Sequence, residues 1–224
     1  MDKITTATST FSVFGNVSEL INKIDAIKAL FPDFKHEEQK GTLPNGLPTT
    51  SHILHNENKA VIIRTYRIDV QYGYIVENND TIDTFLSFAN DVIAKLTQIA
   101  TPKFNRIAYT DTNFVVRTDD VMAKFNKLFN VANVFGAQGN ELQVRVNNVK
   151  DVNGEMINCV TIAQDGAAQN KNSGERSSVI FINNDINTLA QEREPRFTWE
   201  KSKEILSDLI MVAKERTNKI ADNL

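Results

Sequence analysis

The stretch "RTYRIDVQYGY", residues 64–74, weaves three tyrosines and two arginines into an alternating run. It could be a platform on which nucleic-acid bases stack beside cations, or one side of an ordinary sheet. Side chains alternate along a strand with a period of two. One face then carries Tyr66, Ile68, Val70, Tyr72 and Tyr74, and the other carries Thr65, Arg67, Asp69 and Gln71. Because the tyrosines lie with Ile and Val and opposite Arg67, the pattern favours a half-buried strand.

One functional interpretation of this face remains open. If helices leave it partly uncovered, it forms an apolar groove for a peptide or a partner helix. Tyr66, Tyr72 and Tyr74 are therefore the candidate protein-binding residues.

The chain on either side of this stretch predicts further strands. A single strand over residues 60–76 would be about 55 Å long, well beyond the usual length, so we expect a break near Thr65. The segment "SHILHNENKAVIIR", residues 51–64, has the pattern of a hairpin. Residues 33–51 are polar and contain Pro and Gly, which predicts an exposed loop. The polar residues 164–178 predict a second, mobile loop.

Helical periodicity recurs four times. It predicts a helix from Asn16 to Phe31, and a longer one over residues 78–100 that Asp80 can cap. A short amphipathic helix follows Thr118, and Thr198 caps a final helix. Strands are expected between the last two, including "VANVF" at 131–135.

The order of these elements repeats. Residues 1–102 give strand, helix, three strands, helix, and residues 103–224 give the same order with an extra or longer strand. The segments "VSELINKI" (17–24) and "VMAKFNKL" (121–128) match at a constant offset. An internal duplication is indicated, with two halves fused into one unit. The expected fold class is α+β, a curved antiparallel sheet with amphipathic helices on one face.

Bulk composition restricts the class of protein. The chain has 224 residues, 41% of them hydrophobic, and a net charge of −3, so binding to nucleic acid or anionic lipid would need a local positive patch. Such a patch could form only if the basic residues of 103–150 gather on one surface; a solvated mixed surface is the simpler expectation. A single cysteine, Cys159, and the lack of a secretory signal or a long apolar segment predict a cytoplasmic protein that does not enter a membrane.

Catalytic, cofactor and metal sites have weak support in the sequence. It contains neither a glycine-rich phosphate loop nor a G-x-S-x-G nucleophile motif. His36, His52 and His55 are the only histidines, and positions 52 and 55 of one strand point to opposite faces, which argues against a zinc site. Cys159 lies in an apolar strand and is expected to be a buried, inert thiol. We therefore predict no catalytic residue, no cofactor and no metal.

A resemblance to known proteins rests on three segments, "KAVIIRTYRIDVQYGY", "RIAYTDTNFVV" and "VIFINNDINT". A capped helix follows the first segment and a long helix follows the last. Together they resemble a sporadically distributed family of uncharacterised bacterial proteins. The order of strands and helices is also similar to that of SecB-type chaperones. The resemblance implies an intracellular protein of a bacterium or phage that acts by binding.

The expected function is non-enzymatic protein binding. The partner would be an unfolded chain, as for a chaperone, or a specific host or defence component, and a sheet edge or the last helix could support a homo-oligomer. Two alternatives remain: an enzyme whose dispersed site lies between the two halves, and a nucleic-acid-binding protein, against which the net charge argues.

Overall fold

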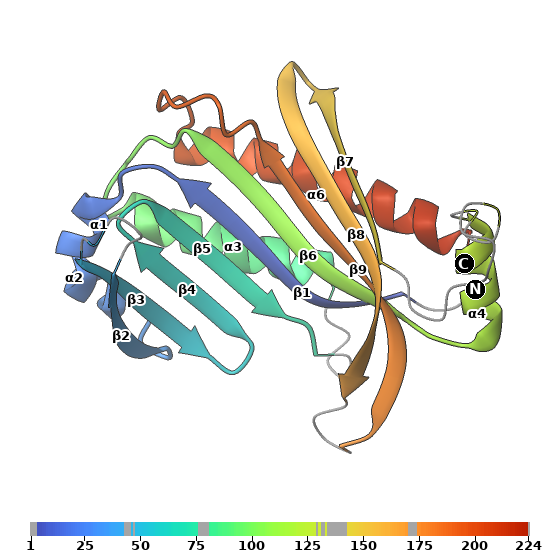
Figure 1. The fold of residues 1–224 in the computed structure, drawn as a ribbon. Helices are drawn as coiled ribbons and strands as arrows, with labels where there is room; N and C mark the ends of the chain where they lie inside the picture. Colours follow the sequence, from blue (N-terminus) through green and yellow to red (C-terminus); the bar gives the residue numbers. More distant parts are fainter. Residues whose placement is uncertain are drawn as a thin grey trace.

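A single antiparallel sheet of nine strands organises the chain in the computed structural model (Figure 1). The structure describes residues 4–42, 46, 48–75, 81–128, 130, 133, 143–169 and 174–223. The strands are β1 (Thr5–Phe14), β2 (Lys35–Thr42), β3 (Pro48–Asn56), β4 (Lys59–Arg64), β5 (Arg67–Gly73), β6 (Arg106–Val116), β7 (Gln143–Val152), β8 (Glu155–Gln169) and β9 (Arg176–Thr188). The helices are α1 (Ser18–Asn22), α2 (Ile24–Leu30), α3 (Ile82–Thr97), α4 (Asp119–Leu128) and α6 (Trp199–Ala221). The predicted α+β class with an antiparallel sheet is confirmed.

The order of strands is symmetric about the central pair β1–β6. Across the sheet it runs β2-β3-β4-β5-β1-β6-β9-β8-β7, so β5 and β9 flank the centre, followed by β4 and β8, then β3 and β7. Among the strands that the structure describes, β2 is the one without a counterpart. Phe11 of β1 lies opposite Tyr109 of β6, and both side chains are buried. The two expected halves thus share one continuous sheet, while the internal duplication and the boundary at residue 102 stay predictions.

Helices α3 and α6 lie against the same face of the sheet (Figure 1). Their apolar residues, such as Phe85 of α3 and Leu209 of α6, belong to one core cluster with alternate residues of the strands. That cluster includes Phe11, Ile68 and Ile107 from the three central strands. We call this the helix side of the sheet and the other the open side.

Most of the stretch 64–74 has the geometry that its pattern predicts, but Tyr66, which was expected on the buried face, lies in a turn and is exposed. Strand β4 ends at Arg64 and β5 begins at Arg67, with a turn at 65–66, so the break is confirmed. Ile68, Val70 and Tyr72 are buried on the helix side, which confirms the half-buried strand. The hairpin over residues 51–64 is also confirmed, as β3 pairs with β4 around a turn at 57–58.

Two expected loops are wrong. Residues 35–42 form strand β2, which pairs with β3 from Lys35 opposite His55 to Thr42 opposite Pro48. Most of the second loop extends the β8–β9 hairpin as far as Gln169 opposite Arg176. In both places the backbone ladder to a neighbouring strand supplies the hydrogen bonds, so a polar, exposed sequence without apolar alternation still forms a strand.

Helix boundaries differ from the expected ones at two places. The helix predicted for Asn16–Phe31 is split at Lys23 into α1 and α2. Helix α3 begins after Thr81, whose side chain and that of Thr84 form a capping box. Asp80 and most of the strand expected at 131–135 lie outside the described residues. The final helix and its cap are confirmed, since Thr198 accepts a hydrogen bond from the Lys201 amide.

Candidate functional site

A pocket of about 430 Å³ lies on the helix side, between α6 and the strands β7 and β8. Alternate residues over part of each strand line it, because side chains alternate along a strand. Strand β7 supplies Val144, Val146, Asn148 and Lys150, and β8 supplies Cys159, Thr161 and Ala163. The walls formed by the strands are thus apolar at one end and polar at the other. We call this cavity the α6 pocket.

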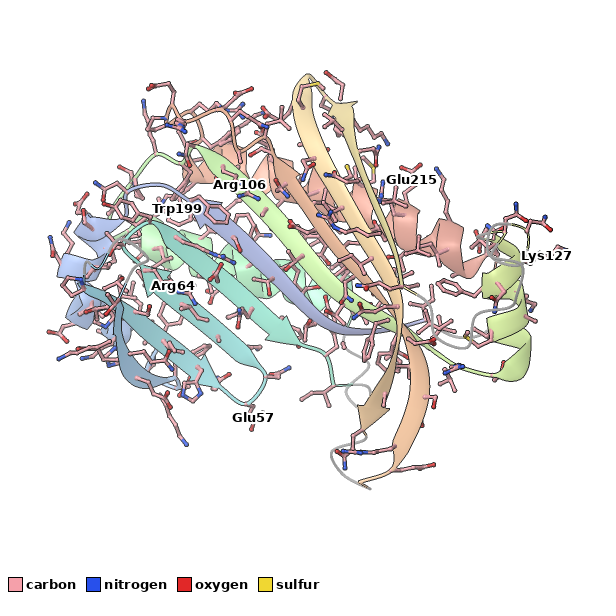
Figure 2. The ribbon with its side chains drawn as sticks, in the orientation of Figure 1. Glu57, Arg64, Arg106, Lys127, Trp199 and Glu215 are labelled. Atoms are coloured by element: carbon pink, nitrogen blue, oxygen red, sulfur yellow. The ribbon has the colours of Figure 1, made fainter. Side chains whose placement is uncertain are left out.

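The third wall of the α6 pocket is one face of α6. Its residues Val212, Glu215, Arg216, Lys219 and Ile220 recur at intervals of three or four, the spacing of neighbours on one side of a helix. Figure 2 labels Glu215 on the stretch of α6 beside β7 and β8. Glu215 accepts from Lys150 at 3.2 Å and from Lys219 at 2.8 Å, and these contacts hold the pKa of its carboxyl below the usual value. It is therefore ionised and neutralised from both sides.

Arg216 differs from its charged neighbours in its partners. Its Nε donates to the Thr161 hydroxyl at 2.5 Å, and its Nη1 donates to the Asn148 side-chain oxygen at 2.7 Å. The acceptors of these two hydrogen bonds are a hydroxyl and an amide oxygen, and neither is a carboxylate. The guanidinium group thus lies on the pocket wall with neutral partners.

A buried polar network continues from Arg216 beneath α6. Thr161 donates to the Asn184 side-chain oxygen at 2.7 Å. The Asn184 amide donates to Thr217 of α6 and to Asp111 of β6, both at 2.8 Å. A chain of hydrogen bonds therefore joins the pocket to the centre of the sheet, where the partners satisfy groups that would be costly to bury alone.

Asp111 is the acidic member of this network. Its side chain accepts from Asn113 at 2.8 Å as well as from Asn184. Burial raises the pKa of the Asp111 carboxyl to about 6, and the hydrogen bonds from Asn184, Tyr109 and Asn113 offset only part of this shift. Folding therefore favours the protonated acid.

This raised pKa predicts a pH-dependent stability. Because the folded protein binds the proton more tightly than the unfolded chain, the contribution of Asp111 to the free energy of unfolding falls as pH rises from about 4 to about 6. Asp111→Asn keeps an oxygen acceptor without the charge. We expect it to raise the free energy of unfolding by up to about 3 kcal/mol at pH 7.5 and to change little at pH 4. Urea denaturation of both proteins across this range measures the difference; a constant difference at every pH would contradict the assignment.

The three candidate tyrosines lie in different environments. Tyr66, in the β4–β5 turn, is 60% exposed, whereas Tyr72 is 3% exposed and packs against Phe88 of α3, with ring centroids 6.2 Å apart. The Tyr74 hydroxyl lies 3.0 Å from that of Ser9. Helix α3 covers the position of Tyr72, Tyr74 is half-buried, and Tyr66 is the most exposed of the three.

The other candidate groups lie apart from the α6 pocket, except Cys159. His52 is buried and its Nδ1 lies 3.2 Å from Nε2 of His36, while His55 lies 3.1 Å from the Glu37 carboxylate. Across the described residues, no three His, Cys, Asp or Glu side chains gather in a way that could hold a metal ion. Cys159 is buried as expected, and burial raises the pKa of its thiol.

The basic residues of 103–150 that the structure describes come from separate elements. Arg106 begins β6 on the open side, where its guanidinium lies 4.9 Å from the centroid of the Phe14 ring. Arg117 follows the far end of this 11-residue strand, more than about 30 Å away, beside Asp165. Lys150 lies at the α6 pocket. These three residues therefore do not form one patch.

The buried polar network was not predicted from the sequence, although one feature of the sequence indicates it. In "RIAYTDTNFVV", Asp111 and Asn113 have the same parity as Ile107 and Val115, which are core residues. Polar residues at core positions of a predicted strand indicate a buried network. No comparable signal marks the α6 pocket, because its three walls are assembled only by folding.

No family model matches this chain, and no curated protein matches it. A solved structure that is similar to it is described as the di-domain ARO/CYC StfQ from the steffimycin biosynthetic pathway. The alignment covers 98% of this chain and 96% of that chain, with 7% identical residues and a TM-score of 0.24. Similarity at this level does not bear on fold or function. None of the helices in the described ranges is long and apolar enough to cross a membrane.

Proposed function

We propose that the protein acts without catalysis, by binding extended segments of other proteins along strand β7. The observation that carries this proposal is the difference between the two edges of the sheet. In the described residues β7 ends the sheet on one side and β2 ends it on the other, so each pairs with a single strand. An edge strand offers free backbone groups to an incoming chain.

The composition of β2 protects its edge. Its sequence, KHEEQKGT, carries Lys35, Glu37, Glu38 and Lys40 and no large apolar residue. Charged side chains on an edge disfavour pairing with another chain, because the charges would lose water in the new interface. Strand β2 is therefore a poor site for strand addition.

Strand β7 is less protected than β2, although Arg145, Lys150 and Asp151 are charged. Its sequence, QVRVNNVKDV, contains four valines, and Val146 and Val149 are 48% and 50% exposed. These two residues have opposite parity, so an added strand would cover an apolar side chain on both faces of the sheet. β-Branched residues also pair well across neighbouring strands. These features support β7 as the site where an extended segment binds.

The test uses an unrelated enzyme that is unfolded in guanidinium chloride and then diluted into buffer. We expect an excess of the protein to suppress light scattering by the aggregating enzyme. During binding, hydrogen exchange of the backbone amides should slow in residues 143–152 and stay unchanged in residues 35–42. No suppression at excess, or equal protection of both edges, would contradict the proposal.

A charged edge provides the matched variant. Asn147 and Val149 have the parity of the open side, so Asn147→Lys with Val149→Lys leaves the α6 pocket intact. We expect this double variant to weaken binding of the unfolded enzyme about tenfold. Gln39→Lys in β2 adds a charge to the opposite edge and should change the affinity less than about twofold.

A single dedicated partner, such as a host or defence component, is the narrower version of this function. In this version the dedicated partner binds at β7 and the unfolded enzyme does not. Pull-down with the wild-type protein and with the double-lysine variant distinguishes a dedicated partner from general binding of unfolded chains. An enzyme with its site between the two halves is the alternative class. The α6 pocket lies within residues 143–220 and not at the β1–β6 seam, so that enzyme would need a second site.

The setting that fits this function is the cytoplasm of a bacterium or of a cell infected by its phage. The free, buried thiol of Cys159 supports a reducing compartment. The symmetric strand order supports two duplicated halves of SecB-like element order. A homo-oligomer formed at the β7 edge would compete with the binding of other chains there. Light scattering that gives the mass in solution tests the oligomer.

A further inference from the structure

We propose that the α6 pocket binds a small amphipathic anion, a carboxylate on a single hydrocarbon chain, whose charged group is held by Arg216. This inference goes beyond protein binding along β7, because the pocket lies between α6 and the helix side of the sheet. It stands on three features: the volume of the pocket, its apolar wall and its excess of positive charge.

The volume and the lining suit a small molecule with a hydrocarbon body. At about 430 Å³, the pocket falls in the range of roughly 300–1,000 Å³ that small-molecule sites occupy. Val144, Val146 and Ala163 line it from the strands, and Val212 and Ile220 line it from the helix. An apolar chain placed there would leave water and gain free energy in proportion to the area it buries.

The charged side chains of the pocket determine which sign of charge the ligand carries. Lys150, Arg216 and Lys219 are cationic, and among the described residues that line the cavity Glu215 is the one acid. Glu215 is already hydrogen-bonded to both lysines. Arg216 is held in place by Thr161 and Asn148, both neutral, so its guanidinium keeps its full charge for an anion.

The geometry of Arg216 also favours a carboxylate. The two hydrogen bonds use Nε and Nη1 and fix the plane of the guanidinium, and neither of them involves Nη2. A planar guanidinium group binds a planar carboxylate better than a lysine does, because its donors are spaced like the two oxygens. The polar end of the pocket is thus prepared for the head of the ligand and the valine end for its tail.

Isothermal titration with dodecanoate, below the concentration at which it forms micelles, tests the proposal. We expect saturable binding of one molecule per chain. Dodecanol has the same tail without the charge and should bind about tenfold more weakly or worse, since it cannot form charge-assisted hydrogen bonds with Arg216. Dodecyltrimethylammonium, with the opposite charge, should not compete.

Variants of α6 and β7 locate the site. Arg216→Gln should weaken dodecanoate binding at least tenfold, whereas Lys214→Gln, which removes an exposed charge of the same helix outside the pocket, should change it less than twofold. Val146→Trp places a large side chain at a half-exposed position of the wall and should block the tail. This variant remains informative if Arg216→Gln fails to fold.

Several results would overturn the proposal: no saturable binding of dodecanoate, equal affinity for the ammonium compound, or unchanged affinity in both Arg216→Gln and Val146→Trp. Cosedimentation with vesicles of anionic phospholipid separates a free acid from a membrane surface, and we expect none. The double-lysine variant of β7 should bind dodecanoate as well as the wild type, so this proposal and the proposed function can fail independently.

Discussion

Trp199→Ala should lower the free energy of unfolding by about 3–5 kcal/mol, the range for removing a large aromatic side chain from a core. Trp199 begins α6 and is buried (Figure 2). Its ring lies edge-on to Phe104 with centroids 4.6 Å apart, and its Nε1 donates to the Ala100 carbonyl at 3.1 Å. The side chain thus packs the start of α6 against the segment between α3 and β6. Its loss opens a cavity and removes the hydrogen-bond donor to the Ala100 carbonyl. Thermal unfolding followed by circular dichroism should show a drop in Tm of about 10 °C or more.

Trp199→Phe is the matched control for this prediction. It keeps an aromatic ring against Phe104 and removes the donor to Ala100, so we expect a smaller loss of about 1–2 kcal/mol. A loss under about 1 kcal/mol in Trp199→Ala would show that α6 is held chiefly by its other apolar residues.

Asp69→Ala should lower the free energy of unfolding by about 2–3 kcal/mol, although it lies on the open side of the sheet. The Asp69 side chain is only 2% exposed. It accepts from the Ser12 hydroxyl at 2.6 Å and from Nε of Arg67 at 2.5 Å, and it also pairs with Arg64. Removing the carboxylate leaves two guanidinium groups side by side with no acid between them. The loss stays below that of a fully buried pair because the two arginines are 40% and 43% exposed and water screens their charges.

A double-mutant cycle separates the ion pair from the loss of packing. If charge dominates, Arg67→Met should remove part of the cost of Asp69→Ala, giving a coupling energy of about 1 kcal/mol or more. Asp69→Asn keeps the shape and the acceptor for Ser12 while removing the charge. A loss below about 0.5 kcal/mol for Asp69→Ala would mean that this cluster contributes nothing measurable, as many exposed ion pairs do.

Asp69 and its neighbours also answer the question raised by residues 64–74. The alternation placed Arg67 and Asp69 on one face, and the structure joins them there by an ion pair. The guanidinium groups of Arg67 and Arg106 both lie 4.9 Å from the centroid of the Phe14 ring, which is on β1. The ring beside the two arginines belongs to another strand, and the tyrosines of the stretch lie on the opposite face or in the turn. One cation does lie beside a tyrosine of the stretch, since Nζ of Lys59 is 5.8 Å from the centroid of the Tyr72 ring. Tyr72 is only 3% exposed, so its ring is not a surface on which a base can stack.

Patterns that repeat within a few residues could be read from the sequence. The period of two predicted which residues of β5 face the helices, although it did not predict that Asp69 on the other face is buried. The helical spacing predicted α3 and α6, because backbone geometry alone fixes these periods. Where a segment lacks such a pattern, as in β2 and the ends of β8 and β9, the strand was missed, since the neighbouring strand supplies its stability.

The candidate site depended on tertiary structure. Arg216, Thr161 and Asn148 are neighbours only because β7 pairs with β8 and α6 crosses both, so up to 68 residues separate groups that share one hydrogen bond. The pKa of Asp111 likewise follows from what covers it, namely Thr217 of α6 and Asn184 of β9. The sequence by itself determined the local periods and therefore the parity of each strand. Only the folded chain decided which polar residues are buried together, because burial and charge pairing depend on elements far apart in sequence.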